Sequence, residues 1–356
     1  MRQQSMQVRI SNCARTADCA VYKIVPREKA VRENSCSQET ASAAHIHNSL
    51  SYPMAPTTIS VVIAAYNRCA YLKAALDSLL CQDLPADSFE IIIVDNNSHD
   101  KTPELAASYC NRSEPGIRYV KELKQGLSFA RNRGVQEARG SIVAFTDDDA
   151  VADKGWLQGL MSVYRQFPDA GVVGGKIKLT WPVEKPAWLS PNLEQSYGAL
   201  DYGDEIQALR YPRTPFGGNF SVPRQLFVEL GGFNTALGRT GAQLLSSEEV
   251  YLCHLVEQHG KKVYYAPQAV VHHTVLPERM SKKYLLKRAY AQGKSNVMVE
   301  QEIGVQQPYV WRTELRDLIE ILKGPIRHIL AKEHWFNAED LFYIFFIMGK
   351  LKARIR

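Results

Sequence analysis

The sequence lacks an apolar run long enough to cross a membrane. The longest such run, Leu341 to Met348, covers less than half of the roughly 20 residues that a membrane-spanning helix needs. Residues 1–30 contain no run of seven apolar residues, so the hydrophobic region of a secretory signal is also missing. We therefore expect neither an integral transporter nor an exported protein.

Paired cysteines and phosphate-binding glycine motifs are missing as well. The seven cysteines are odd in number and scattered, and none forms a Cys-x-x-Cys pair, which favours free thiols in a reducing cytoplasm. The pattern Gly-x-Gly-x-x-Gly does not follow the first predicted strand, and Gly-x-x-x-x-Gly-Lys-Ser/Thr occurs nowhere. The sequence therefore gives no support for an NAD-dependent enzyme or a P-loop nucleotide hydrolase.

The composition is that of an ordinary globular protein. Of the 356 residues, 45% are hydrophobic and 22% are charged. This length indicates one large domain or two modest ones. With 43 Lys and Arg against 37 Asp and Glu, the net charge of +6 is too small to imply nucleic-acid binding, which needs a clustered basic face.

Residues 1–55 show neither helical nor strand periodicity and are rich in Ser, Asn, Gln and Ala. We predict a disordered N-terminal extension. Met54 lies just before the first predicted strand, which raises the second hypothesis that translation starts there. The intact mass of protein made from the native gene tests this, and a product beginning at Met1 or Met6 would end the hypothesis.

From Ile59 onward, predicted strands alternate with predicted helices. Residues 59–63 form a buried β-type run, and leucines between positions 72 and 80 follow at helical spacing. Residues 91–94 and 141–146 are similar runs, with helices predicted from Thr102, over 129–139 and over 157–164. This alternation predicts an α/β fold whose sheet consists mainly of parallel strands.

Polar residues follow three of these predicted strands, at residues 65–68, 95–97 and 147–149. Ligands of such sheets bind at the carboxyl ends of the strands, so the three groups are expected to meet at one edge. The consecutive carboxylates at 147–149 would repel one another unless a cation neutralised them, and oxygen ligands suit Mg²⁺ or Mn²⁺. A solvated acidic turn before the next helix is the alternative.

Seven segments carry a family resemblance, in this order: ISVVIAAYNR, IIIVDNNS, GLSFARNRG, IVAFTDDDA, FGGNFSVPRQLFVELGGF, SSEEVYLCHLVEQHG and YYAPQAVVHH. Together they resemble glycosyltransferase family 2 with the GT-A fold over residues 59 to about 295. The resemblance implies a Rossmann-like, mixed and mostly parallel sheet flanked by helices. It also implies an inverting transfer from a nucleotide-diphospho-sugar to an acceptor hydroxyl.

The resemblance assigns donor-binding roles to several residues. Asp149 would coordinate the divalent metal, and Asp147, with Asp148 beside it, would contact the ribose or the sugar. His272 is a further candidate metal or diphosphate contact, with a structural histidine as the alternative. The base, the ribose and nearby parts of the nucleotide would be held by Ala65, Tyr66, Arg68, Asp95, Asn96 and Arg131, with Asn132 close by.

The acceptor side of the resemblance includes a catalytic base. The family's usual pair is Glu-Asp, with the second carboxylate as base, whereas this chain has Glu248-Glu249. Glu249 is therefore the expected base, and Glu248 can serve instead. The alternative is a carboxylate pair that only stabilises the helix dipole. The acceptor would meet Gly218 and Asn219, and Trp181 could stack on it, although a tight turn and ordinary packing explain these residues equally well.

The resemblance fades beyond residue 295. Leucine and isoleucine spacing predicts an amphipathic helix near 315–322, and a second helix carries the apolar run at 341–348. Cationic side chains at alternate positions from 350 to 356 follow this run, so an anionic membrane surface is a candidate partner. The alternative is a helix packed on the catalytic domain with a solvated basic tail.

The expected organisation therefore has three parts. Residues 1–55 form the extension, 56–295 the GT-A domain with a nucleotide half (56–150) and an acceptor half (151–295), and 296–356 a helical C-terminal extension. The expected function is metal-assisted transfer, UDP-sugars being the commonest family donors, to a glycan or a lipid-linked acceptor in polysaccharide biosynthesis. We expect a cytoplasmic protein, peripheral at the inner face of the plasma membrane.

Two other functions remain open at this point. A nucleotide-sugar or glycan-binding module without turnover would tolerate the unusual Glu248-Glu249 pair. A nucleotidyltransferase would need a glycine-rich loop bearing Arg and Lys after the first strand, where this chain has residues 65–68 instead.

Overall fold

The computed structural model describes residues 59–111, 115–241, 243–304 and 337–355, together with Arg316 and Ile319. The N-terminal extension and the proposed start at Met54 lie outside these residues. The helix predicted at 315–322 lies outside them too, apart from Arg316 and Ile319.

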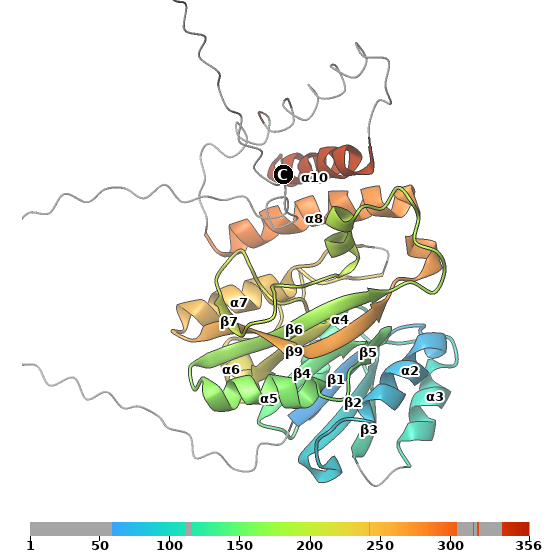
Figure 1. Ribbon diagram of the computed structural model, residues 1–356, viewed down its shortest axis with the longest axis vertical. Coiled ribbons are helices and arrows are strands. Elements are labelled where there is room, and N and C mark those ends of the chain that lie inside the picture. Colours follow the sequence, from blue (N-terminus) through green and yellow to red (C-terminus); the bar gives the residue numbers. More distant parts are fainter. Residues whose placement is uncertain are drawn as a thin grey trace, which may run out of the picture.

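The N-terminal part of the sheet consists of parallel strands, as the alternating pattern predicted (Figure 1). These strands lie in the order β3-β2-β1-β4 from the edge of the sheet inward. The helices that follow the first three strands begin and end within a few residues of the predicted positions. The elements are β1 (Ile59–Ala65), α2 (Cys69–Leu79), η1 (Ala86–Ser88), β2 (Phe89–Asp95), α3 (Thr102–Tyr109), β3 (Gly116–Lys121), α4 (Leu127–Glu137) and β4 (Ile142–Asp147).

The C-terminal part of the sheet makes it mixed, because β8 runs antiparallel to β4 and to β6. In the described part of the chain the sheet has nine strands, in the order β3-β2-β1-β4-β8-β6-β9-β5, with β7 paired to β9. The added elements are β5 (Ala150–Ala152), α5 (Trp156–Gln166), β6 (Ala170–Thr180), η2 (Pro191–Tyr197), β7 (Gln207–Leu209), β8 (Asn219–Pro223), α6 (Arg224–Glu229), α7 (Glu248–Gln258), β9 (Lys262–Thr274) and η3 (Pro277–Arg279).

Helices cover both faces of the sheet, and β1 shows why. Side chains alternate along a strand, so Val61 and Ile63 join the core under α2, α3 and α5, whereas Val62 joins the core under α4, α6 and α7. A strand buried on both faces becomes a continuous apolar run, which is the pattern of residues 59–63. The mixed, mostly parallel sheet between helices is therefore confirmed.

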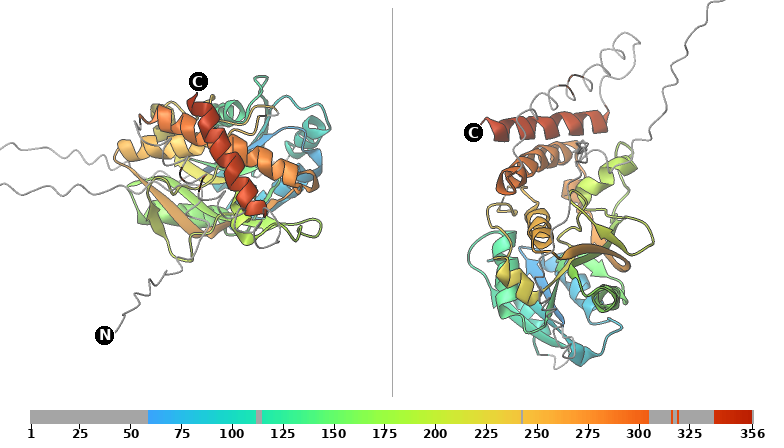
Figure 2. Two further views of the ribbon diagram at one scale, coloured as in Figure 1. Left: turned by 90° about the horizontal axis from the view of Figure 1, so that it is seen from above. Right: turned by 90° about the vertical axis from the view of Figure 1, so that its left-hand side faces the viewer.

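Two further helices, α8 (Lys282–Glu302) and α10 (Ala338–Arg354), pack on each other at one end of the molecule (Figure 2). The boundary predicted at residue 295 falls inside α8, so it is not a break between structural units. Phe342, Phe346 and Ile347 of α10 are buried in a cluster with Leu285 and Ala289 of α8. None of the described helices is long and apolar enough to cross a membrane.

Candidate active site

A cavity of about 480 Å³ lies where the loops that follow β1, β2 and β4 meet the start of α7 and the helix α8. This is the edge of the sheet at which the sequence placed the ligand. The following residues with predicted roles line the cavity: Ala65, Tyr66, Arg68, Asn96, Arg131, Asp147, Asp148, Asp149, Gly218, Glu248 and Glu249. The other five, Asp95, Asn132, His272, Asn219 and Trp181, do not line it, and the Asn132 side chain instead pairs with the backbone of Phe233.

The loop after β1 is fastened to the loops after β2 and β4 by side chains that accept backbone N–H bonds. Asn67, in the left-handed region at φ 52°, donates its N–H to Ser98 Oγ at 3.0 Å. The N–H of Tyr66 donates to Asp148 Oδ2 at 3.2 Å, and that of Arg68 to Thr102 Oγ1 at 3.2 Å. These bonds hold the Tyr66 and Arg68 side chains at the mouth of the cavity.

Asp95 and Asn96 hold the loops of the site in place through hydrogen bonds. Asp95 is fully buried and accepts hydrogen bonds from Tyr119 Oη and from the N–H of Ser98. It therefore positions the loop and offers no free atom on the cavity surface, unlike the direct contact expected from the sequence. The Asn96 side chain donates to the carbonyls of Glu122 and Lys124 and accepts from the N–H of Gly126, so it braces the loop before α4.

The three consecutive aspartates have different environments. Burial and the charge of Asp149 raise the pKa of Asp148 well above its usual range, with Arg68 opposing them. Burial alone would also raise the pKa of Asp149, but His273 and Arg279 outweigh it and hold that pKa below its usual range. Asp149 is thus a buried carboxylate held in its charged form by His273 and Arg279, which rules out the solvated acidic turn.

Asp147, Asp149 and His273 form a group whose ligand atoms all lie within 4.8 Å of one another. The Nε2 atom of His273 is 3.2 Å from Asp149 Oδ1, and its Nδ1 atom is buried without a hydrogen-bond partner among the residues that the structure describes. His272, the histidine chosen from the sequence, faces away and lies 2.9 Å from Asp153 Oδ1. The structure therefore corrects that assignment to the neighbouring residue.

Arg131 links the aspartates to Glu248, one of the two glutamates predicted to include the catalytic base. Its guanidinium is 3% exposed and donates to Asp147 Oδ1 and to Glu248 Oε1, both at 2.9 Å. A Cβ on Gly218 would approach Asp147 Oδ2 to 2.6 Å, so only glycine leaves the carboxylate its place there. Arg131 thus sets the orientation of both carboxylates.

Glu248 and Glu249 are the first two residues of α7, and both are buried. Glu248 is held by Arg131 through Oε1, whereas Glu249 has no ion pair among the described residues. The Oε2 atoms of both glutamates are buried and have no hydrogen-bond partner in the described part of the chain. Burial, followed by the charge of Glu249, raises the pKa of Glu248 to about 7 against the opposing charge of Arg131.

Two residues expected to meet the acceptor have structural roles instead. The Asn219 side chain is fully buried, accepts from Trp156 Nε1 at 2.8 Å and donates to the carbonyls of Lys176 and Ala269. It joins β8 to α5, β6 and β9 and has no amide hydrogen left for a ligand. Trp181 packs behind Tyr197, with ring centroids 6.0 Å apart, and Tyr197 is the residue that lines the cavity.

The far wall of the cavity comes from elements that the sequence motifs did not include. Tyr284 and Arg288 of α8 and Phe342 of α10 line it opposite the nucleotide loops. Arg288 donates to the Leu244 carbonyl and to Ser246 Oγ, so α8 fastens the segment that leads into the glutamate pair. These residues lie in no motif, and only the fold brings them to the site.

Comparison with known proteins identifies a family domain in this chain. A family model described as glycosyl transferase family 2 matches residues 60–226. This segment is a glycosyltransferase family 2 domain. A glucosyl-dolichyl phosphate glucuronosyltransferase of Haloferax volcanii is 27% identical over 247 residues, which are 68% of this chain and 77% of the relative. Glycosyltransferase AglE of the same organism is 30% identical over 125 residues, 35% of this chain and 40% of that relative.

The fold agrees with this membership. The mannosyltransferase PcManGT of Pyrobaculum calidifontis, solved with GDP-Man and Mn²⁺, superposes with a TM-score of 0.56 at 18% identity. The match covers 84% of this chain and 86% of that one. The protein is thus a glycosyltransferase with a GT-A fold and a family 2 domain, which argues against the nucleotidyltransferase alternative.

Proposed function

We propose that the protein transfers a sugar, with inversion, from a nucleotide-diphospho-sugar to a hydroxyl of a glycan or lipid-linked acceptor in glycan biosynthesis. The observation that carries the proposal is the presence, in one cavity, of the group Asp147, Asp149 and His273 and of the unpartnered carboxylate oxygen of Glu249. A UDP-sugar is the donor that we favour. The name of the Haloferax volcanii relative supports a lipid-linked acceptor.

A divalent cation fits the residues present. Two carboxylates and an imidazole converge on one region, and carboxylate oxygens are ligands that Mg²⁺ and Mn²⁺ prefer. Asp147, Asp149 and His273 would hold the ion. When bound there, it would neutralise the negative charge that develops on the leaving nucleoside diphosphate.

The chain's own residues would then position the donor. Tyr66 and Arg68, with the backbone at Ala65, form the part of the cavity nearest the ends of β1 and β2, where base and ribose are expected. Arg131 keeps Asp147 turned toward Gly218, beside the expected place of the sugar. Nucleotide contacts by residues 56–150 and acceptor contacts from residue 151 onward remain our proposed division of labour.

Glu249 is the proposed base. Its carboxylate would accept the proton of the acceptor hydroxyl while the hydroxyl oxygen bonds to the anomeric carbon and the bond from that carbon to the diphosphate breaks. Attack on the face opposite the leaving group inverts the anomeric configuration. Glu248 is less suited because Arg131 occupies one of its oxygens at 2.9 Å.

Substitution of each glutamate tests the assignment of the base. We expect Glu249→Gln to lower the rate of transfer from the UDP-sugar by about 10² to 10⁴, because proton transfer is lost. Glu249→Asp should retain part of the rate, since it restores the family's usual carboxylate. UDP affinity, measured by calorimetry with Mn²⁺, should change in neither variant. If Glu248→Gln abolishes transfer and Glu249→Gln does not, the two roles are reversed.

We retain a cytoplasmic location, peripheral at the inner face of the plasma membrane, as part of the proposal. The apolar residues expected to insert into the membrane are largely turned toward α8. Arg354 and Lys350 lie by Glu300 of α8, at 2.5 and 3.9 Å. A membrane contact of α10 would therefore rest on the remaining basic residues and on exposed Met348 and Ile355.

A further inference from the structure

The residue before the glutamate pair has an unusual backbone conformation. Ser247 is the N-cap of α7 and lies in the left-handed region at φ 110°. A residue with a Cβ rarely adopts this conformation, and it persists only where neighbouring contacts hold it. The contacts of Ser247 therefore determine the direction in which α7 begins.

The hydroxyl of Ser247 does not cap the helix that it precedes. An N-cap serine ordinarily accepts a backbone N–H from the first turn of its own helix, but within the described residues Ser247 makes no such bond. Ser247 is 3% exposed, and its Oγ atom instead accepts a hydrogen bond from Gln292 Nε2 of α8 at 3.2 Å. The N-cap of α7 is thus held by another helix.

Side chains of α8 also hold the residue before it, Ser246. The N–H of Ser246 donates to Ser295 Oγ, and Arg288 donates to Ser246 Oγ, both at 3.0 Å. Ser246 Oγ donates to Gln292 Oε1 at 3.0 Å. Gln292 therefore bonds both serines, one through its oxygen and the other through its nitrogen, and joins the segment that leads into the glutamate pair to α8.

Glu249 depends on this backbone more than Glu248 does. Arg131 holds the Glu248 carboxylate by a contact at 2.9 Å. Glu249 has no ion pair among the described residues, and its Oε2 atom has no hydrogen-bond partner there. The direction of the Glu249 side chain thus follows from the place where the first turn of α7 begins.

We propose that Gln292 is a positioning residue for the catalytic base: by holding Ser247 in its left-handed conformation, it fixes the first turn of α7 and with it the Glu249 carboxylate. The proposal rests on the proposed function, in which Glu249 accepts the proton of the acceptor hydroxyl. Gln292 also lines the cavity, so direct contact with a substrate is the competing role. A misplacement of reacting groups by about 1 Å can cost about 10²-fold in rate, so a small shift of α7 is measurable.

Release of UDP by the full chain tests the proposal. The probes are UDP-glucose, UDP-galactose and UDP-N-acetylglucosamine, with water in place of the acceptor hydroxyl, since Glu249 would accept the proton of either. Gln292→Met preserves helix propensity and removes the bonds to both serines, and we expect it to lower kcat by about 10- to 100-fold. The KM of the donor and the affinity for UDP with Mn²⁺ should not change, because the bonds of Gln292 to the two serines lie outside the nucleotide loops.

Variants at Ser247 separate positioning from substrate contact. Glycine adopts φ 110° without a steric penalty, so Ser247→Gly combined with Gln292→Met should regain part of the kcat that Gln292→Met loses. Ser247→Ala combined with Gln292→Met retains the Cβ and should regain nothing. If Gln292 acts by touching the substrate, Ser247→Gly restores no activity either, and that result would overturn the proposal. An unchanged kcat in Gln292→Met would overturn it as well.

Amide hydrogen exchange gives a readout that does not require turnover. The N–H of Tyr251, which donates to the Ser247 carbonyl at 3.1 Å, should exchange faster in Gln292→Met and recover when Ser247→Gly is added. Gln301→Met, at an exposed position of α8 outside the cavity, is the matched control and should change neither exchange nor kcat. A wild type that releases UDP from none of the probes would count against the proposed function alone. Exchange at Tyr251 would then decide the role of Gln292, and unchanged exchange would overturn it.

Discussion

Two neighbouring histidines of β9 have different surroundings and provide a matched pair of variants. His273 lies against Asp149, and His272 lies against Asp153 outside the cavity. We predict that His273→Ala weakens the Mn²⁺-dependent part of UDP binding by about 10-fold or more, because one of three candidate ligands is lost. His272→Ala should leave it unchanged. Calorimetric titration with Mn²⁺ and with EDTA measures both, and equal losses would contradict the assignment.

The sequence could not distinguish these two histidines. Strand alternation identifies an inward side chain only where one face of a strand is polar, and β9 is buried on both faces from Val263 to Ala266. Pairing with β5, which sets Ala150 opposite His273, decides which imidazole meets Asp149. That pairing is a long-range contact. Asp147 and Asp149, by contrast, directly follow a predicted strand, so their place was predictable.

The same limit explains the two acceptor residues. Gly218 was placed correctly beside the site because its motif lies next to β8. The role of Asn219 depends on Trp156, Lys176 and Ala269, which are 43 to 63 residues away in the chain. No local pattern contains that information.

Glu248 should make the stability of the protein depend on pH. Its pKa is raised to about 7 from the ordinary 4.5, by burial and by Glu249 against Arg131. A group with a raised folded-state pKa contributes stability that is fully present below pH 4.5 and is lost as the pH rises to about 7. Gln imitates the neutral form of the side chain. The free energy of unfolding of Glu248→Gln should therefore rise by about 1 to 3 kcal/mol relative to that of the wild type as the pH is raised from 5 to 8.

Urea unfolding of both proteins at the two pH values measures this difference. Glu184→Gln, at an exposed position without an ion pair among the described residues, is the control and should show no change with pH. A constant difference between wild type and Glu248→Gln would mean that Glu248 titrates in its ordinary range.

At the level of the elements, α8 and α10 cross with their backbones in contact at two glycines. A Cβ on Gly293 would collide with the Phe346 carbonyl, and one on Gly349 with the Tyr290 carbonyl. We predict that Gly349→Leu forces α10 away from α8 and costs about 1 to 3 kcal/mol of stability. Thermal unfolding and amide hydrogen exchange of α10 measure the effect.

The crossing also links α10 to the cavity through Phe342. Gly349→Leu should therefore displace Phe342 in the cavity wall while leaving UDP binding intact, since none of the residues expected to hold the nucleotide belongs to α10. Gly116→Ala is the matched control, because a Cβ there meets nothing within 4 Å. Unchanged protection of α10 in Gly349→Leu would show that the helix does not need this close approach.

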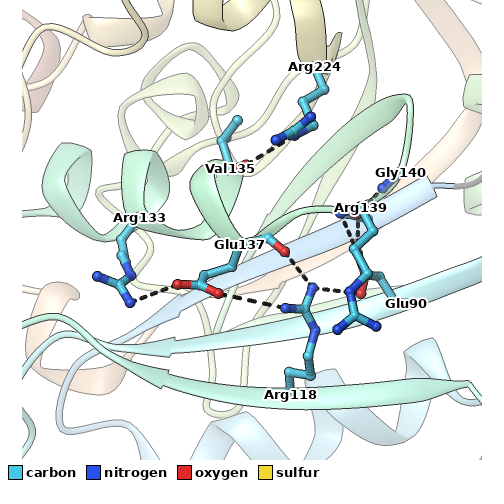
Figure 3. A network of polar contacts seen from close by, with 9 residues as sticks. Glu90, Arg118, Arg133, Val135, Glu137, Arg139, Gly140 and Arg224 are labelled. Carbon is cyan, nitrogen blue, oxygen red and sulfur yellow. Dashed lines mark hydrogen bonds and ion pairs between the residues drawn. The ribbon is translucent and has the colours of Figure 1, made fainter.

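A second element-level feature lies at the opposite edge of the sheet, where Glu90 joins β1, β2, β3 and the end of α4 (Figure 3). Burial alone would raise the pKa of Glu90, but hydrogen bonds from Ser60, from the N–H of Arg139 and from Arg118 outweigh it, and the pKa is lowered. The stability that this group contributes is present above its ordinary pKa of 4.5 and is lost as the pH falls below that value.

We predict that Glu90→Gln costs about 1 to 3 kcal/mol at pH 7 and that the cost shrinks on acidification, because the charge-assisted bonds are lost in the wild type as well. Urea unfolding at pH 7 and pH 4 measures it, with the exposed Glu205 replaced by Gln as the control. A cost that does not change with pH would mean that the carboxylate charge contributes nothing.

Elements were predictable where the pattern is local and strong. The runs at 59–63, 91–94 and 141–146 became β1, β2 and β4 within a few residues. The helix predicted from Thr102 begins there, as α3, and no side chain caps it, since Thr102 Oγ1 accepts the N–H of Arg68 from another loop. The short strands β5 and β7 exist through their pairing with β9 and have no signal of their own.

For the whole molecule, the packing of α10 on α8 bears on the two roles that the sequence left open for α10. The sequence predicted either a membrane-surface helix or a helix packed on the catalytic domain, and the burial of Phe342, Phe346 and Ile347 against α8 favours the second. Removing α10 would then expose α8 residues such as Leu285 and Ala289, which are now fully buried. An exposed apolar surface of this kind promotes aggregation.

We predict that a chain ending at Lys323 is less soluble and unfolds at a lower temperature than the full chain, because it loses the covering of this cluster. Static light scattering and thermal unfolding compare the two chains, and dye binding to exposed apolar surface should rise in the shorter one. A membrane-surface helix predicts the reverse, with better solubility and loss of binding to vesicles of anionic lipid. Since Arg354 and Lys350 are already engaged with Glu300, the proposed membrane contact depends on cations such as Lys352, and a full chain with Lys352→Ser should bind such vesicles less tightly than the wild type. Unchanged binding would mean that the tail adds no charge to a membrane contact.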